Sequence, residues 1–223
     1  MATIKTIAIV GATGRMGSGI ARRLRGKYRL LLMARDVKKL VDLQTELARP
    51  TDPDIYALSC AREAAWEADI IIIATPPEEE LQVAEKIREV AIGKIVVSIS
   101  HPEMSASSMS PEVPSAAEEL QRRLPHSQVI KTFSTTFADS VIAVKDGKVV
   151  DAFVAGNNSD AVDIVSEVVT DAGLSPVPIV DLTMSRILER VQLTLVRLTS
   201  SRPQASYSHG RPVRRPGGVE ARS

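Results

Sequence analysis

A strand, a glycine-rich turn and a helix follow one another at the start of this chain. The apolar run at 4–10 leads into Gly-x-x-Gly-x-x-Gly, formed by Gly11, Gly14 and Gly17, and a helical pattern follows. Glycines in such a turn permit a tight bend, a close approach of the backbone to phosphates, and packing of helix on strand. The N–H groups at the helix start attract negative charge. The pattern therefore predicts a site for a dinucleotide diphosphate, rather than a glycine turn that binds nothing.

The end of the next predicted strand, at 28–33, bears on which dinucleotide is bound. NAD-binding folds place an acidic residue about 20 positions past the glycines, where it binds the ribose 2′-hydroxyl. This chain has Arg35 near that position, and a guanidinium can bind a 2′-phosphate through two parallel hydrogen bonds. Arg15, together with Lys38 or Lys39, adds positive charge, whereas Asp36 fits a ribose-binding acid placed one position late. The sequence favours NADP(H) over NAD(H).

Strands and helices alternate along most of the chain, which indicates an α/β fold with a doubly wound, Rossmann-type parallel sheet. The four isoleucines at 70–73 are typical of a central strand buried on both faces. Asp146 and Gly147, between two apolar runs, predict a hairpin. The predicted strands are 4–10, 28–33, 54–58, 68–74, 94–100, 128–133, 141–144, 149–155 and 176–180, and the predicted helices are 18–24, 37–48, 61–66, 78–90, 115–124, 158–172 and 183–198.

These elements divide the chain into three parts. We expect a dinucleotide-binding domain at 1–133 and a C-terminal extension at 134–198, in which the hairpin and a helix complete a second substrate site and a dimer contact. The segment 199–223 is rich in Arg, Ser, Pro and Gly without apolar periodicity, which predicts a disordered basic tail.

Composition limits the classes of partner. Lys and Arg number 28 against 27 Asp and Glu, and only 3% of residues are aromatic, which argues against nucleic-acid binding. The longest uncharged apolar run, 70–74, is too short to span a bilayer. Cys60 is the single cysteine, so neither an intrachain disulfide nor a thiolate metal cluster is expected. We expect a cytoplasmic protein that acts on small molecules and holds no metal.

Several segments resemble, in order, the coenzyme F-420-dependent NADP oxidoreductase family, the NADPH:deazaflavin reductases. The resemblance covers roughly residues 4–198. Its segments are the glycine turn at 11–17, the helix start at 115–120, the stretches 124–125 and 129–133, the turn at 154–158, and Ser185-Arg186-Ile187-Leu188-Glu189, which matches the family's Arg-Leu-Leu-Glu helix.

The resemblance implies hydride transfer between C4 of a nicotinamide and C5 of a deazaflavin or flavin-like acceptor, in a homodimer joined by the last helix. The cofactors carry the reaction, while the protein holds the rings in contact and excludes water. In the family the nicotinamide lies against three loops, here 75–77, 100–102 and 134–136, which makes His101 and Ser134 the catalytic candidates. The predicted cofactor-binding residues are Gly11, Thr13, Gly14, Arg15, Met16, Gly17, Arg35, Lys39, Thr75, Pro76, Ser100 and Pro102.

Two other functions stay open at this point. An NADP-dependent dehydrogenase or reductase of a small carbonyl, imine or cyclic acid would need basic residues near the nicotinamide for a substrate carboxylate. The candidates are His101 and, more remotely, Lys131 and Arg186. A non-catalytic nucleotide-binding sensor or subunit is favoured by Ser134, where the resembling family usually has Asn or His, and by the basic C-terminus.

Overall fold

The computed structural model describes residues 5–100, 113–133 and 150–200, without the side chains of 195–200. Eight strands form one sheet in the order β3-β2-β1-β4-β5-β6-β7-β8. The strands are β1 Thr6–Val10, β2 Arg29–Met33, β3 Ile55–Leu58, β4 Ile70–Ile73, β5 Ile95–Ser98, β6 Gln128–Lys131, β7 Asp151–Gly156 and β8 Ser175–Ile179. The helices are α1 Arg15–Leu24, α2 Val37–Leu47, α3 Ala61–Glu67, α4 Pro77–Ile87, α5 Ala116–Arg123, α7 Ser159–Asp171 and α8 Ser185–Ser200, with a 3₁₀ turn, η2, at Leu182–Met184.

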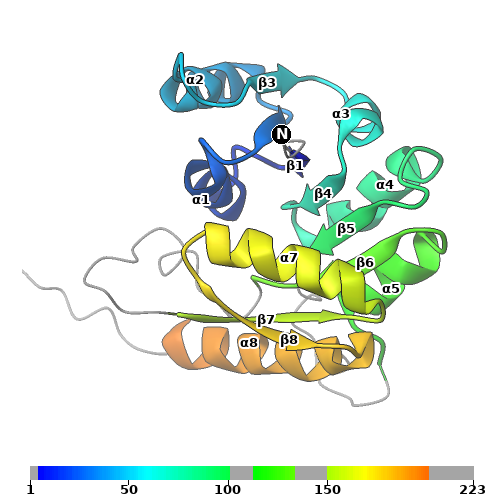
Figure 1. Cartoon of the computed structure of the whole chain (residues 1–223). Helices are drawn as coiled ribbons and strands as arrows, with labels where there is room; N and C mark the ends of the chain where they lie inside the picture. Colours follow the sequence, from blue (N-terminus) through cyan, green and yellow to red (C-terminus); the bar gives the residue numbers. More distant parts are fainter. Residues whose placement is uncertain (1–4, 101–112, 134–149, 201–223) are drawn as a thin grey trace, which may run out of the picture.

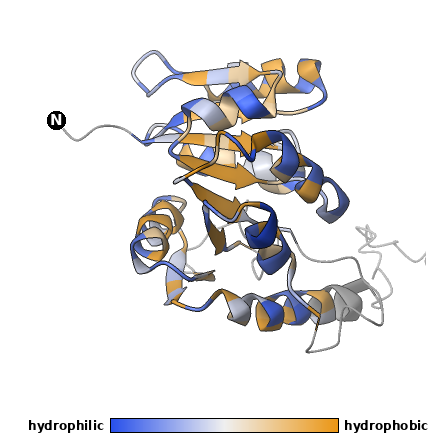
Figure 2. Ribbon diagram, turned by 90° about the vertical axis from the view of Figure 1, so that its right-hand side faces the viewer, coloured by the Kyte–Doolittle hydropathy of each residue, from blue (hydrophilic) through white to orange (hydrophobic). Residues whose placement is uncertain are grey.

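Helices cover both faces of the sheet, as predicted for a doubly wound fold (Figure 1). The core on one face joins α1, α2 and α7 to the strands, and the core on the other joins α3, α4 and α5. The strands form the apolar centre of the molecule (Figure 2). The isoleucines of β4 are at most 1% exposed, which confirms the prediction of a central strand.

The sheet is mostly parallel, and its one antiparallel pairing joins β6 to β7 among the described strands. The register Ile130↔Gly156 and Lys131↔Ala155 brings the C-terminal extension directly beside the dinucleotide-binding half. A sheet that is parallel except at one pairing is common in this fold class. β8 then runs parallel to β7. The predicted strand at 141–144 and its turn lie outside the described residues.

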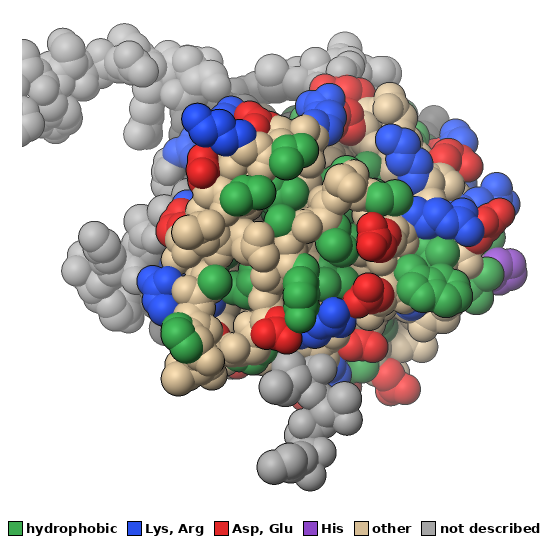
Figure 3. Space-filling model, turned by 90° about the horizontal axis from the view of Figure 1, so that it is seen from above, with side chains coloured by type: hydrophobic (Ala, Val, Ile, Leu, Met, Phe, Trp, Pro, Cys, Tyr) green, Lys and Arg blue, Asp and Glu red, His purple; other side chains and the backbone are tan. Residues whose placement is uncertain are grey.

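The edge of the molecule formed by α2, β3 and α3 carries charged side chains of both signs (Figure 3). Lys and Arg lie among Asp, Glu and scattered hydrophobic side chains on this face, rather than in a patch of one sign. Arg22 of α1 and Glu46 of α2 form an exposed ion pair, 2.8 Å apart. In the described part of the chain, no helix is both long enough and apolar enough to cross a membrane.

Candidate nucleotide-binding site

The glycine turn between β1 and α1 is built by close backbone contacts. Gly11 has φ +87°, and a Cβ there would lie 2.4 Å from the carbonyl oxygen of Ala74 at the end of β4. A Cβ at Gly17 would lie 2.3 Å from the carbonyl oxygen of Gly11. Gly14 is the N-cap of α1, and no side chain of the described residues caps this helix. The first turn of α1 therefore presents backbone N–H groups suited to an anion.

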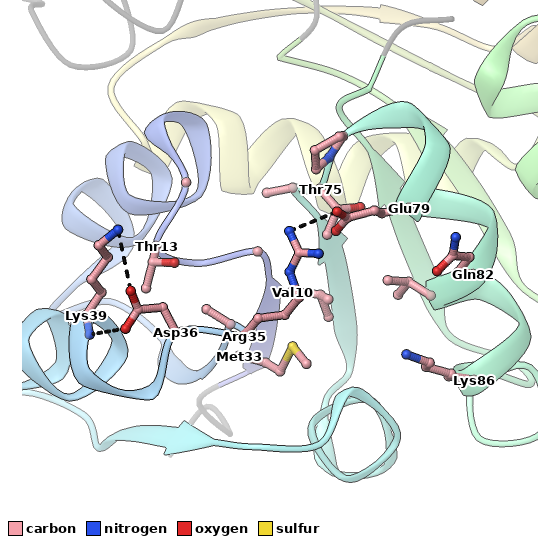
Figure 4. A pocket seen from close by; sticks show the side chains of 16 residues that line it. Val10, Thr13, Met33, Arg35, Asp36, Lys39, Thr75, Glu79, Gln82 and Lys86 are labelled. Atoms are coloured by element: carbon pink, nitrogen blue, oxygen red, sulfur yellow. Dashed lines mark hydrogen bonds and ion pairs between the residues drawn. The ribbon is translucent and has the colours of Figure 1, made fainter. Parts of the chain in front are cut away.

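A cavity of about 400 Å³ lies beside this turn (Figure 4). The ends of β1, β2 and β4, the first turn of α2 and one face of α4 form its walls. Its volume lies within the range of small-molecule sites. Among its lining residues are these members of the predicted cofactor-binding set: Gly11, Thr13, Gly14, Arg35, Lys39, Thr75 and Pro76.

Arg35 and Lys39 stand on the β2 side of the cavity, and each contacts a carboxylate. The guanidinium of Arg35 lies 2.9 Å from Oε1 of Glu79, which belongs to α4 on the opposite wall (Figure 4). The Nζ of Lys39 lies 3.4 Å from Oδ2 of Asp36. Asp36 also caps α2, because its Oδ1 accepts the backbone N–H of Lys39 at 3.0 Å. This backbone hydrogen bond is the main reason that the pKa of Asp36 lies below its ordinary value.

One wall of the cavity was missed by the sequence analysis. Glu79, Gln82, Val83 and Lys86 line it from α4. Their spacing of three, four and seven positions puts them on one face of a helix. That spacing, in a helix that begins just after the predicted contacts Thr75 and Pro76, is the signal that could have identified them.

The remaining predicted cofactor residues have other surroundings. Arg15, Met16 and Gly17 are not among the described residues that line the cavity; Gly17 is buried against the turn and Met16 packs against the core. Ser100 is buried at the end of β5 and hydrogen-bonds Glu80 of α4. The predicted contacts His101, Pro102 and Ser134 lie outside the described residues.

A second group of charges lies beyond Ser100, inside the protein. Lys131 of β6 is 0% exposed, and its Nζ lies 2.9 Å from Oε1 of Glu189 on α8, which is 1% exposed. The same Nζ donates a hydrogen bond to the carbonyl oxygen of Ser100. The carboxylate of Glu189 also accepts the backbone N–H groups of Ala116 at 2.9 Å and Ala117 at 3.4 Å, at the start of α5. A carboxylate is stabilised at that end of a helix.

Glu80 is a second carboxyl group in this buried cluster. Its Oε2 accepts a hydrogen bond from the hydroxyl of Ser100, and its Oε1 has no hydrogen-bond partner among the described residues. Burial raises the pKa of Glu80 above its ordinary value, although the positive charge of Lys131 and the hydrogen bond from Ser100 act against that rise. The environment therefore favours the neutral form of Glu80.

The segment 185–189 attaches α8 to α5. Arg186 donates to both oxygens of Glu118, each at 2.7 Å, and Ser185 lies within hydrogen-bond distance of Ser115, the N-cap of α5, at 2.6 Å. Burial raises the pKa of Glu118, but the hydrogen bonds from Arg186 and Ser115 outweigh it and leave that pKa below its ordinary value. Lys131 and Arg186, the remote candidates for binding a substrate carboxylate, are both paired with protein carboxylates instead.

Comparison of this chain with known proteins shows which family it belongs to. The model of the family described as NADP oxidoreductase, coenzyme F-420-dependent, matches residues 6–102. An F-420-dependent NADP reductase of Methanocaldococcus jannaschii is 30% identical over 205 residues, which cover 86% of this chain and 91% of that protein. The chain belongs to the coenzyme F-420-dependent NADP oxidoreductase family. Membership in this family of NADP-dependent oxidoreductases confirms the prediction made from the sequence.

Two further proteins are similar along most of their length. An F-420-dependent NADP reductase of Methanothermobacter marburgensis is 25% identical over 204 residues, covering 86% of this chain and 91% of that protein. A crystal structure of a candidate F-420-dependent NADP reductase from an Arthrobacter species has a TM-score of 0.70 at 22% identity, and the match covers 89% of this chain and 94% of that protein. The latter likeness confirms the predicted Rossmann-type fold of this F-420-dependent oxidoreductase family member.

Proposed function

We propose that this protein transfers a hydride between NADP(H) and a deazaflavin acceptor, coenzyme F-420. The observation that carries the proposal is Arg35, which stands on the wall of the cavity beside the glycine turn, where NAD-binding folds place an acid. The names of the relatives, which are F-420-dependent NADP reductases, support the choice of acceptor.

The described residues are suited to binding the phosphate groups of the dinucleotide. The glycine turn runs so close to the end of β4 that a Cβ at Gly11 would clash with the Ala74 carbonyl, and the start of α1 offers N–H groups to the diphosphate. Arg35 and Lys39 would hold the 2′-phosphate from the end of β2. Once bound, NADP(H) supplies the hydride chemistry through its nicotinamide ring. His101 and Ser134 remain our predicted contacts to the reacting rings.

Replacement of Gly14 by Val tests the glycine turn. A side chain there would occupy the space of the diphosphate, so we expect calorimetry to show no NADPH binding by Gly14→Val. A Cβ at this position would also lie 3.2 Å from the carbonyl oxygen of Gly11, so circular dichroism must first show that the variant is folded. A folded variant that binds NADPH as the wild type does would exclude the turn as the site.

Absorbance spectroscopy tests the acceptor. NADPH oxidation should be fast with coenzyme F-420, slower with a free flavin, and absent with pyrroline carboxylate. Oxidation by pyrroline carboxylate alone would replace the proposal with the dehydrogenase alternative. NADPH binding without oxidation by any of the three would favour a sensor or subunit.

We further propose that the protein forms a homodimer through α8. Ile187 and Val191 on this helix are 51% and 45% exposed, whereas Leu188 and Leu193 are buried against the protein. Closed twofold dimers are the commonest assembly of soluble proteins. Light scattering should report a dimer for the wild type and a monomer for Ile187→Glu. Val41→Glu is the matched control, because Val41 is 47% exposed on α2. A monomeric wild type would contradict the dimer.

A further inference from the structure

The ion pair between Arg35 and Glu79 crosses the cavity from β2 to α4 (Figure 4). The two side chains are 81% and 26% exposed, so water and ligands can reach the pair. Arg35 is also the residue best placed to hold a 2′-phosphate. The same guanidinium can therefore bind either the carboxylate of Glu79 or the 2′-phosphate of a bound dinucleotide.

We propose that Glu79 is a specificity-determining residue, whose carboxylate competes with the 2′-phosphate for Arg35 and thereby limits the preference for NADPH over NADH. The inference rests on the proposed function, because it requires NADP(H) in this cavity. A guanidinium presents its donors in one rigid fork, and both a carboxylate and a phosphate use that fork. NADPH must break the contact to Glu79, whereas NADH has no phosphate to exchange for it.

Glu79 also affects the charge of the cavity. It lies in the first turn of α4, where a carboxylate is stabilised by the helix N-terminus. Because it lines the cavity, its charge repels a phosphate held there. Competition for Arg35 and direct repulsion act in the same direction. When Glu79 becomes neutral the repulsion disappears and the competition weakens, because an amide oxygen binds a guanidinium less strongly than a carboxylate does.

The exposure of the pair sets the size of the effect. Exposed ion pairs contribute little because water and salt screen them. We therefore expect Glu79→Gln to tighten NADPH binding about two- to fivefold. NADH binding should change by less than about twofold, and the gain for NADPH should shrink as salt is raised.

Glu78→Gln is the matched control. Glu78 lies in the same first turn of α4, so its neutralisation removes the same interaction with the helix N-terminus. It is exposed and is not among the described residues that line the cavity. A change shared by both variants would therefore come from the helix, and a change confined to Glu79→Gln would come from the cavity.

The experiment measures the dissociation constants of NADPH and NADH for the full chain and for Glu79→Gln, Glu78→Gln, Arg35→Ala and the Arg35→Ala/Glu79→Gln double variant. The proposal requires tighter NADPH binding in Glu79→Gln alone, and loss of most of that gain when Arg35 is absent. A gain that persists in the double variant would mean that Glu79 acts by repulsion alone, and would overturn the competition.

Two other results would also overturn the proposal. Weaker NADPH binding by Glu79→Gln would mean that the carboxylate orients Arg35 for the phosphate instead of competing for it. Unchanged binding would mean that the pair has no effect on selectivity. Failure of the proposed function gives a different signature, because a wild type that binds neither NADPH nor NADH fails before any variant is compared.

Discussion

Two ion pairs of equal length occupy opposite environments in this protein. Arg35 and Glu79 lie 2.9 Å apart across the cavity, and Lys131 and Glu189 lie 2.9 Å apart in the interior. In the first pair Arg35 is 81% exposed and Glu79 26%, whereas both members of the second pair are at most 1% exposed. An exposed pair costs little to break and can exchange one partner for a ligand. A buried pair cannot, because the charge left behind would have neither water nor a counter-ion.

The largest expected effect is the loss of the buried cation. Lys131→Met removes the charge that faces Glu189 and the donor that binds the Ser100 carbonyl. We expect the free energy of unfolding to fall by about 3–5 kcal/mol, the usual cost of leaving a buried charge unpaired. Denaturant titration followed by circular dichroism measures this change.

An exposed pair provides the control for Lys131→Met. Arg62 and Glu89 lie 2.7 Å apart, and their side chains are 54% and 75% exposed. Arg62→Met makes the same kind of replacement, and we expect it to change stability by less than about 0.5 kcal/mol. Similar losses in the two variants would contradict the distinction between buried and exposed pairs.

Arg35→Ala should separate binding from stability. We expect NADPH binding to weaken by about 1–3 kcal/mol, the scale of charge-assisted hydrogen bonds, with little change for NADH. Stability should change by less than about 0.5 kcal/mol, because Arg35 is 81% exposed. Calorimetry with each nucleotide measures the first effect and thermal unfolding the second. Equal losses of affinity for NADPH and NADH would show that Arg35 does not bind the 2′-phosphate.

The smallest effect concerns pH. The pKa of Glu80 is raised by burial, so the folded state binds this proton more tightly than the unfolded chain does. Ionisation of Glu80 therefore lowers the free energy of unfolding as the pH rises above the ordinary range of a glutamate. Gln cannot ionise. The melting temperature of Glu80→Gln should therefore rise relative to that of the wild type as the pH increases from about 5 to about 8.

Glu78→Gln again serves as the control for the pH experiment, because Glu78 is exposed on the same helix. Its melting temperature should differ from that of the wild type by a nearly constant amount over the same range. If the melting temperatures of Glu80→Gln and the wild type also differ by a constant amount over this range, Glu80 is ionised throughout, as an ordinary surface glutamate is.

The sequence predicted one wall of the cavity better than the other, because local segments of the chain form that wall. The glycine turn and Arg35 follow from local spacing, because each lies just beyond a strand whose apolar pattern is clear. The opposite wall depends on which helix packs on the other side of the cavity from the end of β2. The pairing of Arg35 with Glu79 is such a contact, and no local pattern specifies it.

The buried cluster illustrates the same limit more sharply. A lysine near the end of a strand is usually exposed, and the sequence suggested a distant substrate contact for Lys131. Its partner Glu189 comes from α8, and only the folded chain brings the two together. The matched segment 185–189 was one of several that indicated the family, but it did not indicate that its Ser, Arg and Glu attach α8 to α5.

The contact of Glu189 with the start of α5 has a consequence for the order of folding. Its carboxylate accepts the N–H of Ala116 across 73 positions of sequence. During synthesis the chain reaches Ala116 long before Glu189 is made. Until then α5 lacks this carboxylate at its first turn, and Lys131 lacks its counter-ion. Contacts of such long sequence separation form late, because a long loop must close first. Helix α8 thus completes a helix and a strand that left the ribosome much earlier.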